Sequence, residues 1–384
     1  MNPDNQSSEF RLCVNCVMDS SDPDISFNSE GVCSHCQGYP QRKAAFVPSV
    51  EEGKGLLEKM VRDCKKAGKN KSYDCVIGVS GGVDSSYVAY LVCQLGLRPL
   101  AVHLDNGWNS ELAVSNIRNL LQKLGIELHT YVLDWESFLD LQLAFLKAST
   151  PDSEIPSDHA IVALMRSVAD KEGVPVIWGV NFSSEAILPQ AWSQGHMDWT
   201  YIKNVHKAYG KKKLKNYPHY SVWKLLWYNR IRRQKLYNIL NYLSYNKEEA
   251  KKILLEETSW RDYGGKHFES TYTKIFQSYI LPEKFNFDKR KAHYSSLILS
   301  GQMERNDALE LLKKSPFNEN TIKADIEFLA KKLQISVKEF EEIMSSPPKK
   351  YADFKSQWPD YVKKADKAIF KRIIAIKRSL LNRK

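Results

Sequence analysis

Residues 73–87 constrain the fold of this 384-residue chain more than any other segment. A short apolar run, 75–79, is followed directly by Ser-Gly-Gly-Val-Asp-Ser-Ser and then by a segment with helical periodicity. Glycines let the backbone approach an anion closely, and the free N–H groups and dipole of a first helical turn attract phosphate. We therefore predict a strand, a phosphate-binding turn and a helix in immediate succession. The residues predicted to contact phosphate are Ser80, Gly81, Gly82, Asp84, Ser85 and Ser86.

Asp84 has two possible roles in this loop. Its carboxylate can hold a magnesium ion beside the phosphates, or it can cap the helix. The loop lacks the lysine of G-x-x-x-x-G-K-[ST], so transfer of a γ-phosphate is not expected and binding of pyrophosphate is. An ordinary capped helix is the alternative. A cap needs only one such residue, however, and this loop has six in order.

Short apolar runs alternate with amphipathic segments after residue 73. The runs lie at 75–79, 100–104, 128–133 and 174–179, and helices are predicted at 86–95, 110–124 and 159–171. Runs of that length with helices between them are typical of β-α-β units. The expected fold class is therefore α/β, with a doubly wound parallel sheet.

Ligands of such a sheet bind outside the carboxyl ends of its strands. His103 and Asp105 lie where the second run ends, and we predict that they contact the nucleotide. Gly179 ends the fourth run and is also placed at the nucleotide, while Glu185 follows it and is free to meet magnesium or a second substrate. Either segment alone could be a plain turn.

Two cysteine pairs lie near the N-terminus. Sixteen residues lie between Cys13-x-x-Cys16 and Cys33-x-x-Cys36, a spacing typical of a tetrahedral thiolate zinc site. Four ligands leave no open position, so the zinc is predicted to be structural in a ribbon too small to fold unaided. An iron–sulfur cluster or unligated thiols are the alternatives. The catalytic sheet is expected to fold without this ribbon.

The net charge and the hydropathy of the chain limit which partners are possible. The net charge of +11 favours anions but does not distinguish nucleic acids, nucleotides and acidic sugars. No stretch approaches the ~18 apolar residues of a membrane span, and the N-terminus lacks the order of a secretory signal. A cytoplasmic protein without a membrane partner is expected, with its cysteines as metal ligands or core residues.

The composition changes along the chain and suggests six regions. They are a zinc ribbon, a linker helix, a nucleotide-binding domain, a basic and aromatic insertion, a helical substrate-binding region and C-terminal helices, predicted at 1–45, 46–72, 73–188, 189–245, 246–315 and 316–384.

Two clusters in the second half could be functional or merely exposed. Lys266 lies on a polar stripe with Ser270, Thr273 and Gln277, which periodicity alone would assign to a solvated face. Arg290 and His293 lie three residues apart and are either surface residues or an anion clamp.

The loop resembles the S-G-G-x-D-S signature of the PP-loop ATP pyrophosphatases, which adenylate an oxygen and release pyrophosphate. The chain as a whole resembles a narrower family, the N-acetyl sugar amidotransferases of bacterial O-antigen and lipopolysaccharide synthesis. That resemblance covers about residues 13–312 and rests on the loop and on the motifs at 157–161, 179–185, 263–270 and 288–293.

The resemblance implies an activity and a set of roles. Such enzymes use ATP and magnesium to convert an acetamido group of a nucleotide sugar, here an N-acetylated UDP-sugar, into an acetamidino group. Separate glutaminase and cyclase-like proteins supply the ammonia. Asp158 or Glu185 would be the base or a magnesium ligand, and Lys266 and His267 would contact phosphate or acceptor. The substrate-binding residues would be Asn181, Glu269, Arg290 and His293.

Two rival functions are considered. A tRNA-modifying PP-loop enzyme, such as a thiouridine synthase, would use the basic insertion to hold RNA. Sulfur transfer often uses cysteines near the strands, but the corresponding segment here is Pro156-Ser-Asp-His159, so nucleic acid is not the expected partner. A non-enzymatic zinc-ribbon adaptor would have a degenerate loop, and every expected loop residue is present.

Overall fold

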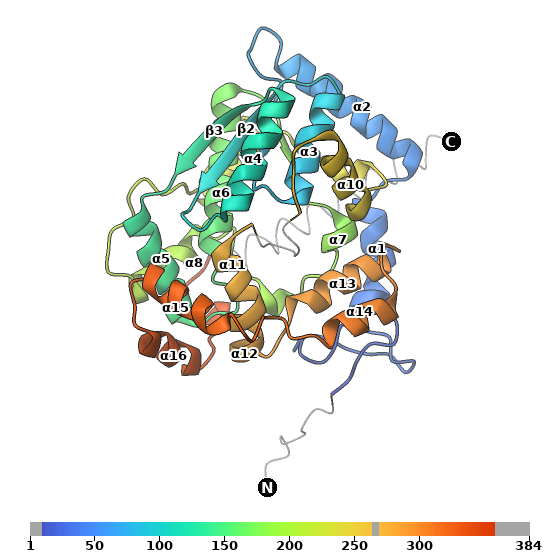
Figure 1. Cartoon of the computed structure of the whole chain (residues 1–384). Coiled ribbons are helices and arrows are strands. Elements are labelled where there is room, and N and C mark those ends of the chain that lie inside the picture. The colour runs from blue at the N-terminus through green and yellow to red at the C-terminus, as the bar shows by residue number, and fades with distance from the viewer. Residues whose placement is uncertain (1–9, 263–268, 358–384) are drawn as a thin grey trace.

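A computed structural model describes residues 10–262 and 269–357 of the chain (Figure 1). Lys266 and His267 lie outside the described residues. In the described part, no helix combines the length and the apolar character needed to cross a bilayer.

A five-stranded parallel sheet forms the centre of the molecule. Its strands are β1 (Cys75–Gly78), β2 (Pro99–Asp105), β3 (Glu127–Val132), β4 (Val176–Trp178) and β5 (Leu236–Asn238), in the order β3-β2-β1-β4-β5. The chain first runs outward from β1 to β3 and then returns to the other side of β1, so the order reverses between β1 and β4. This confirms the predicted α/β class and puts the topological switch point beside the phosphate loop.

Helices cover both faces of the sheet, as the side chains of β1 illustrate, because they are buried on both of its faces. Cys75 and Ile77 pack with α2 (Val50–Ala67), α3 (Val83–Gln94), α4 (Glu111–Leu124) and α10 (Lys247–Glu257), whereas Val76 faces the opposite side. That opposite side is covered by α5 (Trp135–Ala148), α6 (Ile155–Glu172) and α8 (Trp199–Tyr209). Alternate residues of a strand point to opposite faces, so a strand buried on both sides is apolar throughout.

Helix boundaries follow from local chemistry. The side chain of Ser110 accepts a hydrogen bond from the Ala113 amide at the start of α4, and Gly125 ends that helix with a left-handed φ of 64°. Gly173 ends α6 in the same conformation. The helices predicted at 110–124 and 159–171 are therefore confirmed, although α6 begins earlier, at Ile155.

Several of the remaining helices lie on the side of the carboxyl edge of the sheet. In Figure 1, α7, α11, α12 and α13 lie below β2 and β3. The other helical elements of the described chain are α1 (Ser34–Phe46), α7 (Phe182–Glu185), η1 (Gln190–Trp192), α9 (Val222–Leu226), η2 (Trp227–Ile231), η3 (Ile239–Tyr242), α11 (Thr271–Ile275), η4 (Phe276–Ile280), α12 (Leu281–Phe285), α13 (Lys289–Leu299), α14 (Arg305–Leu312), α15 (Ile322–Lys332), α16 (Val337–Ser345) and η5 (Tyr351–Asp353).

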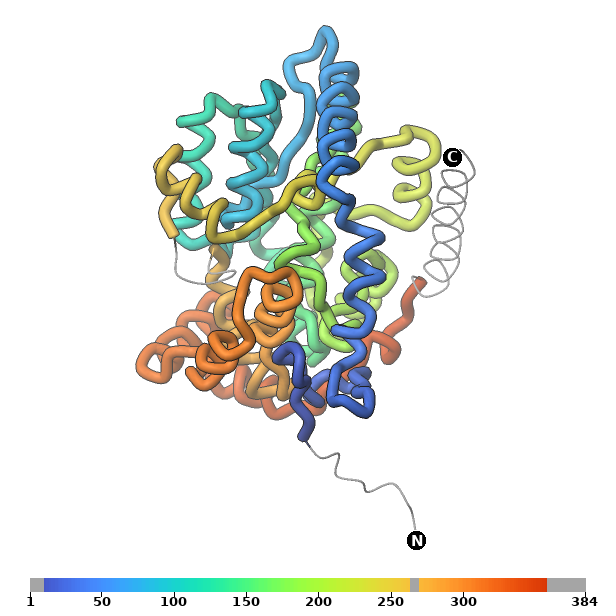
Figure 2. Tube along the Cα trace, turned by 90° about the vertical axis from the view of Figure 1, so that its right-hand side faces the viewer, coloured from blue at the N-terminus to red at the C-terminus, as the bar shows by residue number. Residues whose placement is uncertain are grey.

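The N-terminal segment packs against the C-terminal half of the chain. Figure 2 shows the dark blue N-terminal loops beside the orange α13 and α14. Its four cysteines and Met18 are buried in the same apolar cluster as Val76 of β1 and the helices on that face. The cysteine segment is therefore not an isolated lobe but part of the main core.

Candidate active site

The phosphate loop has the predicted strand-turn-helix form. β1 ends at Gly78, Gly81 adopts a left-handed φ of 83°, and Gly82 is the N-cap of α3. A Cβ atom on Gly81 would lie 2.7 Å from the carbonyl oxygen of Ala113 in α4. The loop therefore needs glycine at this position both for its conformation and for the close approach of a neighbouring helix.

Hydrogen bonds hold the loop in an anion-binding shape. The Ser80 amide donates to Ser85 Oγ at 3.2 Å, and the Gly82 amide donates to Ser80 Oγ at 3.3 Å. From outside the loop, the Trp260 indole N–H donates to the Gly81 carbonyl at 2.8 Å. Trp260 is 1% exposed and lies 179 residues away in sequence, so no local pattern could have identified it.

Substituting Gly81 should destabilise the protein because of both constraints. We expect Gly81→Ala to lower the free energy of unfolding by about 1–3 kcal/mol, since alanine is strained at positive φ. Gly55→Ala is the matched control. Gly55 lies inside α2, and the position that its methyl group would take has open space around it, so this substitution should be neutral or stabilising. Urea denaturation measures both, and equal effects of the two substitutions would contradict the expectation.

The first turn of α3 carries the groups that would meet a nucleotide. Asp84 accepts a hydrogen bond from the Tyr245 hydroxyl. Burial, and then the charge of Asp84, raises the pKa of Tyr245, so this hydroxyl stays protonated. Ser86 Oγ is buried and has no hydrogen-bond partner within the described residues. A buried hydroxyl beside free helical amides fits a phosphate oxygen, and the Asp84 carboxylate fits magnesium.

The end of β4 packs directly on this turn. A Cβ atom on Gly179 would lie 3.4 Å from the Ser85 nitrogen and the Asp84 carbonyl carbon. The structure therefore brings Gly179 beside the loop, as the position of the two strand ends suggests.

The end of β2 forms the other side of the site. His103 Nδ1 donates to the Val79 carbonyl at 2.8 Å, so its Nε2 accepts from the Asn109 amide at 3.1 Å. The same amide donates to Asp105 at 3.2 Å. These three side chains line a groove of about 470 Å³ whose apolar wall includes Ile117 and Leu121 of α4. The groove has the size and mixed polarity of a small-molecule site.

Three carboxylates, Asp152, Glu154 and Asp158, cluster around Lys289 at the N-terminus of α6, and we call this cluster the recess. Glu154 accepts hydrogen bonds from Gln277 at 2.8 Å and from Lys289 of α13 at 3.4 Å. Asp152, 4% exposed, accepts a hydrogen bond from Ser193 at 2.5 Å. Burial lowers the pKa of Lys289, but the carboxylates of Glu154, Asp152 and Asp158 outweigh it and raise that pKa overall. Asp152, Glu154 and Lys289 were not foreseen from the sequence.

Asp158 lies in the first turn of α6, and part of its surface is exposed to solvent. Its pKa is nevertheless raised to about 8, first because the surrounding protein displaces much of the water, and then because of the negative charges of Asp152, Glu154 and Glu185. Asp158 can therefore hold or release a proton near neutral pH.

The raised pKa predicts a pH-dependent contribution to stability. The folded state keeps a proton on Asp158 that the unfolded chain releases above about pH 4, so the stability from this group falls as pH rises from about 4 through about 8. Asp158→Asn should remove this loss. The difference in Tm, variant minus wild type, should increase between about pH 4 and about pH 8 and stay constant below and above that interval. A difference that stays constant from pH 4 to 9 would contradict this prediction.

The other predicted substrate residues lie around α7 and α13. Glu185 is exposed at the end of α7, and its charge acts on both Asp158 and Tyr245, so it lies between the recess and the loop. Asn181 caps α7 by accepting from the Ser184 amide at 2.9 Å. His293 Nδ1 donates to the Ser184 carbonyl at 3.1 Å, which joins α13 to α7.

Arg290 and Glu269 have other local partners. Arg290 donates to Asp288, its own helix cap, at 2.8 Å and to the Lys314 carbonyl at 3.1 Å, and a clamp formed with His293 stays a prediction. The Glu269 carbonyl accepts from the Ser110 amide at 2.8 Å, which ties this segment to the start of α4.

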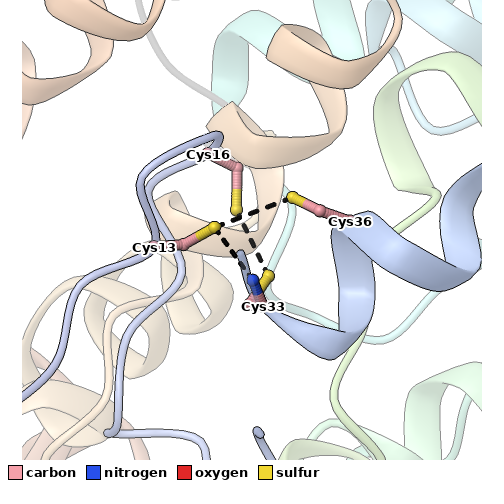
Figure 3. Close-up of side chains that lie close together, drawn as sticks. All are labelled: Cys13, Cys16, Cys33 and Cys36. Carbon is pink, nitrogen blue, oxygen red and sulfur yellow. Dashed lines mark hydrogen bonds between the residues drawn. The ribbon is translucent and has the colours of Figure 1, made fainter. Parts of the chain in front are cut away.

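The four N-terminal cysteines converge as predicted (Figure 3). The sulfur atoms of Cys13 and Cys36 are 3.8 Å apart, those of Cys16 and Cys33 are 3.7 Å apart, and all four lie within 4.8 Å of one another. Zinc bound tetrahedrally at ~2.3 Å requires sulfur atoms about 3.8 Å apart. The residues therefore fit a structural zinc ion. His35 is bonded to Asp22 at 2.7 Å and is not part of the cluster.

The fold and the loop define a PP-loop ATP-binding protein. A family model described as NAD synthase matches residues 56–154, which contain the loop, β2 and β3. A second model, described as the C-terminal domain of WbpG-like LPS biosynthesis proteins, matches residues 269–366. Together the two matches support membership of the WbpG-like family of PP-loop proteins.

Other similarities cover smaller parts or are weak. The tRNA-specific 2-thiouridylase MnmA of Vesicomyosocius okutanii is 30% identical over 105 residues, which are 24% of this chain and 29% of that protein. The same enzyme of Serratia proteamaculans is 32% identical over 99 residues, 22% of this chain and 27% of that protein. The chain thus spans less than a third of the length of these curated relatives.

Two solved structures also align with the chain. The NMN synthetase of Francisella tularensis is 16% identical, with 53% of this chain and 86% of that chain covered, and the NH3-dependent NAD synthetase of Campylobacter jejuni is 21% identical, with 53% and 83% covered. Both have a TM-score of 0.28.

Proposed function

We propose that this ATP-using enzyme is an N-acetyl sugar amidotransferase. It converts an acetamido group of a nucleotide N-acetyl sugar, such as a UDP-sugar, into an acetamidino group through an adenylated intermediate. The main support is that a carboxylate-rich recess lies next to the phosphate loop. One wall of that recess comes from α6, and the other comes from α13 in the WbpG-like domain.

An amide carbonyl is a poor electrophile and needs activation before an amine can displace its oxygen. In the proposed reaction the amide oxygen attacks the α-phosphorus of ATP, and the bond to pyrophosphate breaks. The amides of the loop and the hydroxyls of Ser80, Ser85 and Ser86 bind the departing pyrophosphate. A magnesium ion held by Asp84 would supply charge neutralisation at these phosphates.

The recess suits the second half of the reaction. Ammonia is mostly protonated at neutral pH, and carboxylates attract the ammonium cation. Asp158 has a pKa of about 8, so it is its ionised minority at neutral pH that can accept a proton from ammonium. The free ammonia then attacks the activated amide carbon, and AMP leaves with the original oxygen. Glu185, whose charge acts on both Asp158 in the recess and Tyr245 beside the phosphate loop, is the second candidate base.

The source of the ammonia and the cytoplasmic location of the protein also belong to this proposal. No glutaminase nucleophile motif is recognisable in the sequence, so we assign ammonia production to separate glutaminase and cyclase-like partners in the cytoplasm. Arg290, His293, Asn181 and Glu269 are proposed to contact the acceptor, together with Lys266 and His267, which lie outside the described residues.

A tRNA-modifying function is the second candidate because the curated relatives named above act on tRNA. Residues 199–235 contain eleven lysines and arginines and no aspartate or glutamate, matching the whole net charge of +11. However, Trp227 in this segment is covered by Lys224 at 4.1 Å and Arg232 at 5.5 Å, which leaves less ring for base stacking.

The cysteines also weigh against sulfur transfer at the recess. Of the described cysteines outside the zinc site, Cys64 and Cys75 are buried in the apolar cluster on the opposite face of the sheet, and Cys93 packs against that cluster. Ser157, not a cysteine, lies at the start of α6, where its hydroxyl accepts from Asn106 at 3.0 Å.

One experiment separates the two candidates. Purified protein is incubated with ATP, magnesium and ammonium, and AMP formation is measured with UDP-diacetamido sugars or with bulk tRNA. We expect AMP and pyrophosphate with a sugar nucleotide, an acetamidino product by mass spectrometry, and no use of glutamine without a partner. AMP formation that requires tRNA, with binding that weakens steeply with salt, would establish the rival instead.

A further inference from the structure

We infer that the first cysteine knuckle, Cys13–Asp19, positions the two helices that form the acceptor side of the site, α13 and α7. Ser295, Lys291 and Arg305 are the positioning residues that carry this effect. The acceptor's identity rests on the proposed function, whereas the mechanical coupling does not.

The knuckle is bonded directly to α13. The Val17 amide donates to Ser295 Oγ at 3.1 Å, and Ser295 is fully buried. Asp19, 1% exposed, forms an ion pair with Lys291 one turn earlier on the same helix. A buried, charge-assisted bond next to a buried amide bond fixes both the rotation and the position of the helix along its axis.

A third bond connects the knuckle to the next helix. Arg305, at the start of α14, donates from Nη2 to the Cys13 carbonyl at 2.7 Å and from Nε to the Cys16 carbonyl at 3.0 Å. Both carbonyls belong to residues whose sulfur atoms would bind the metal. Tetrahedral binding fixes the backbone of a short knuckle, so the orientation of these carbonyls depends on the metal site.

The opposite side of α13 faces α7 and the recess. Ser296, adjacent to Ser295, accepts from the Ile187 amide at 3.0 Å, and His293 donates to the Ser184 carbonyl. At the N-terminus of α13, Lys289 reaches the carboxylate of Glu154. Movement of α13 would therefore displace both Lys289, which pairs with Glu154 in the recess, and α7, the helix that carries Glu185.

The second knuckle holds α7 from another direction. It leads into α1, where Arg42 donates to the Ala186 carbonyl at 2.7 Å and the Tyr39 ring lies 5.3 Å from that of Phe182. The helix that ends at Glu185 is thus held between α1 and α13, each of which is fixed at the cysteine cluster.

The phosphate loop depends on other supports. Trp260 and Tyr245, which contact it, belong to the apolar cluster on the opposite face of the sheet from the cysteines. Loosening the knuckle should therefore impair the acceptor side of the reaction far more than ATP binding.

Steady-state kinetics of Arg305→Ala, Ser295→Ala and Lys291→Ala test this. We expect KM for the sugar nucleotide to rise about tenfold, KM for ATP to change less than about twofold, and zinc to remain bound. Lys291→Arg should restore most of the loss because it keeps the charge. Lys313→Ala is the control, since Lys313 is 70% exposed on the surface just after α14 and pairs there with Glu310.

Hydrogen exchange supplies a readout independent of activity. The amides of α7 and α13 should exchange faster in the three variants, while those of α3 should not. Equal changes in both KM values, or unchanged exchange of α7 and α13, would overturn the inference. If the wild type uses no sugar nucleotide at all, the proposed function fails, and the exchange experiment still decides the coupling.

Discussion

Asp84→Asn is expected to lower the rate of AMP formation at least about 100-fold, about 2.7 kcal/mol of transition-state stabilisation. Asparagine keeps an oxygen that can accept from Tyr245 but loses the negative charge proposed to hold magnesium. The loop should keep its shape, because its internal bonds are made by Ser80, Gly82 and Ser85. Stability to urea should change by less than about 1 kcal/mol, since loop residues at a strand end carry function more than packing.

Tyr245→Phe separates the charge of Asp84 from its hydrogen bond. This variant removes the hydroxyl donor and leaves the carboxylate, so its rate should fall much less than that of Asp84→Asn. Nucleotide products are separated by ion-exchange chromatography. Formation of ADP and phosphate by the wild type, or a similar loss of rate in both variants, would show that the loop does not work as proposed.

Cys16→Ser is expected to remove the metal and to destabilise far more than the N-terminal ribbon. Structural zinc contributes about 10–16 kcal/mol in small zinc-binding peptides. A loss of only about 4 kcal/mol would lower Tm by about 5–6 °C for a cooperative unit of this size, at ~2.1 cal/mol/K of unfolding entropy per residue. The four cysteines share their apolar cluster with β1 and with helices after residue 270, so the transition of the whole molecule should shift. The expectation that the sheet is independent of the ribbon therefore does not fit the packing.

Cys93→Ser is the matched substitution, because Cys93 is half-buried on α3 and packs with the other apolar cluster. It should keep one zinc per chain by plasma emission spectrometry and change Tm by less than about 2 °C. Iron with sulfide in freshly purified protein, or no metal in a stable wild type, would refute the zinc assignment.

Local chemistry made the loop and the cysteine site predictable. A left-handed glycine, a helix start and a pair of C-x-x-C knuckles are each specified within a few residues, so their geometry is readable without tertiary information. The apolar runs likewise indicated four of the five described strands. β5 was missed because Leu236–Asn238 is a three-residue edge strand within a basic segment.

The recess could not be predicted in the same way. Its carboxylates and Lys289 come from segments more than a hundred residues apart, and only the packing of α13 on the sheet brings them together. For Arg290 and His293, spacing on one helix left both a surface position and an anion clamp open. The ion pair of Arg290 with Asp288 was not predicted, although this acid two residues earlier was an available signal.

The contact between Val17 and Ser295 spans 278 residues of sequence, which has a consequence for the order of events during synthesis. Translation at ~5–20 residues per second would leave the N-terminal cysteines waiting about 14–56 s for α13 to leave the ribosome. The sheet can assemble during that interval, but the knuckle cannot dock. A nascent chain paused before residue 295 should therefore have thiols that react with alkylating agents, and release of the full chain should protect them.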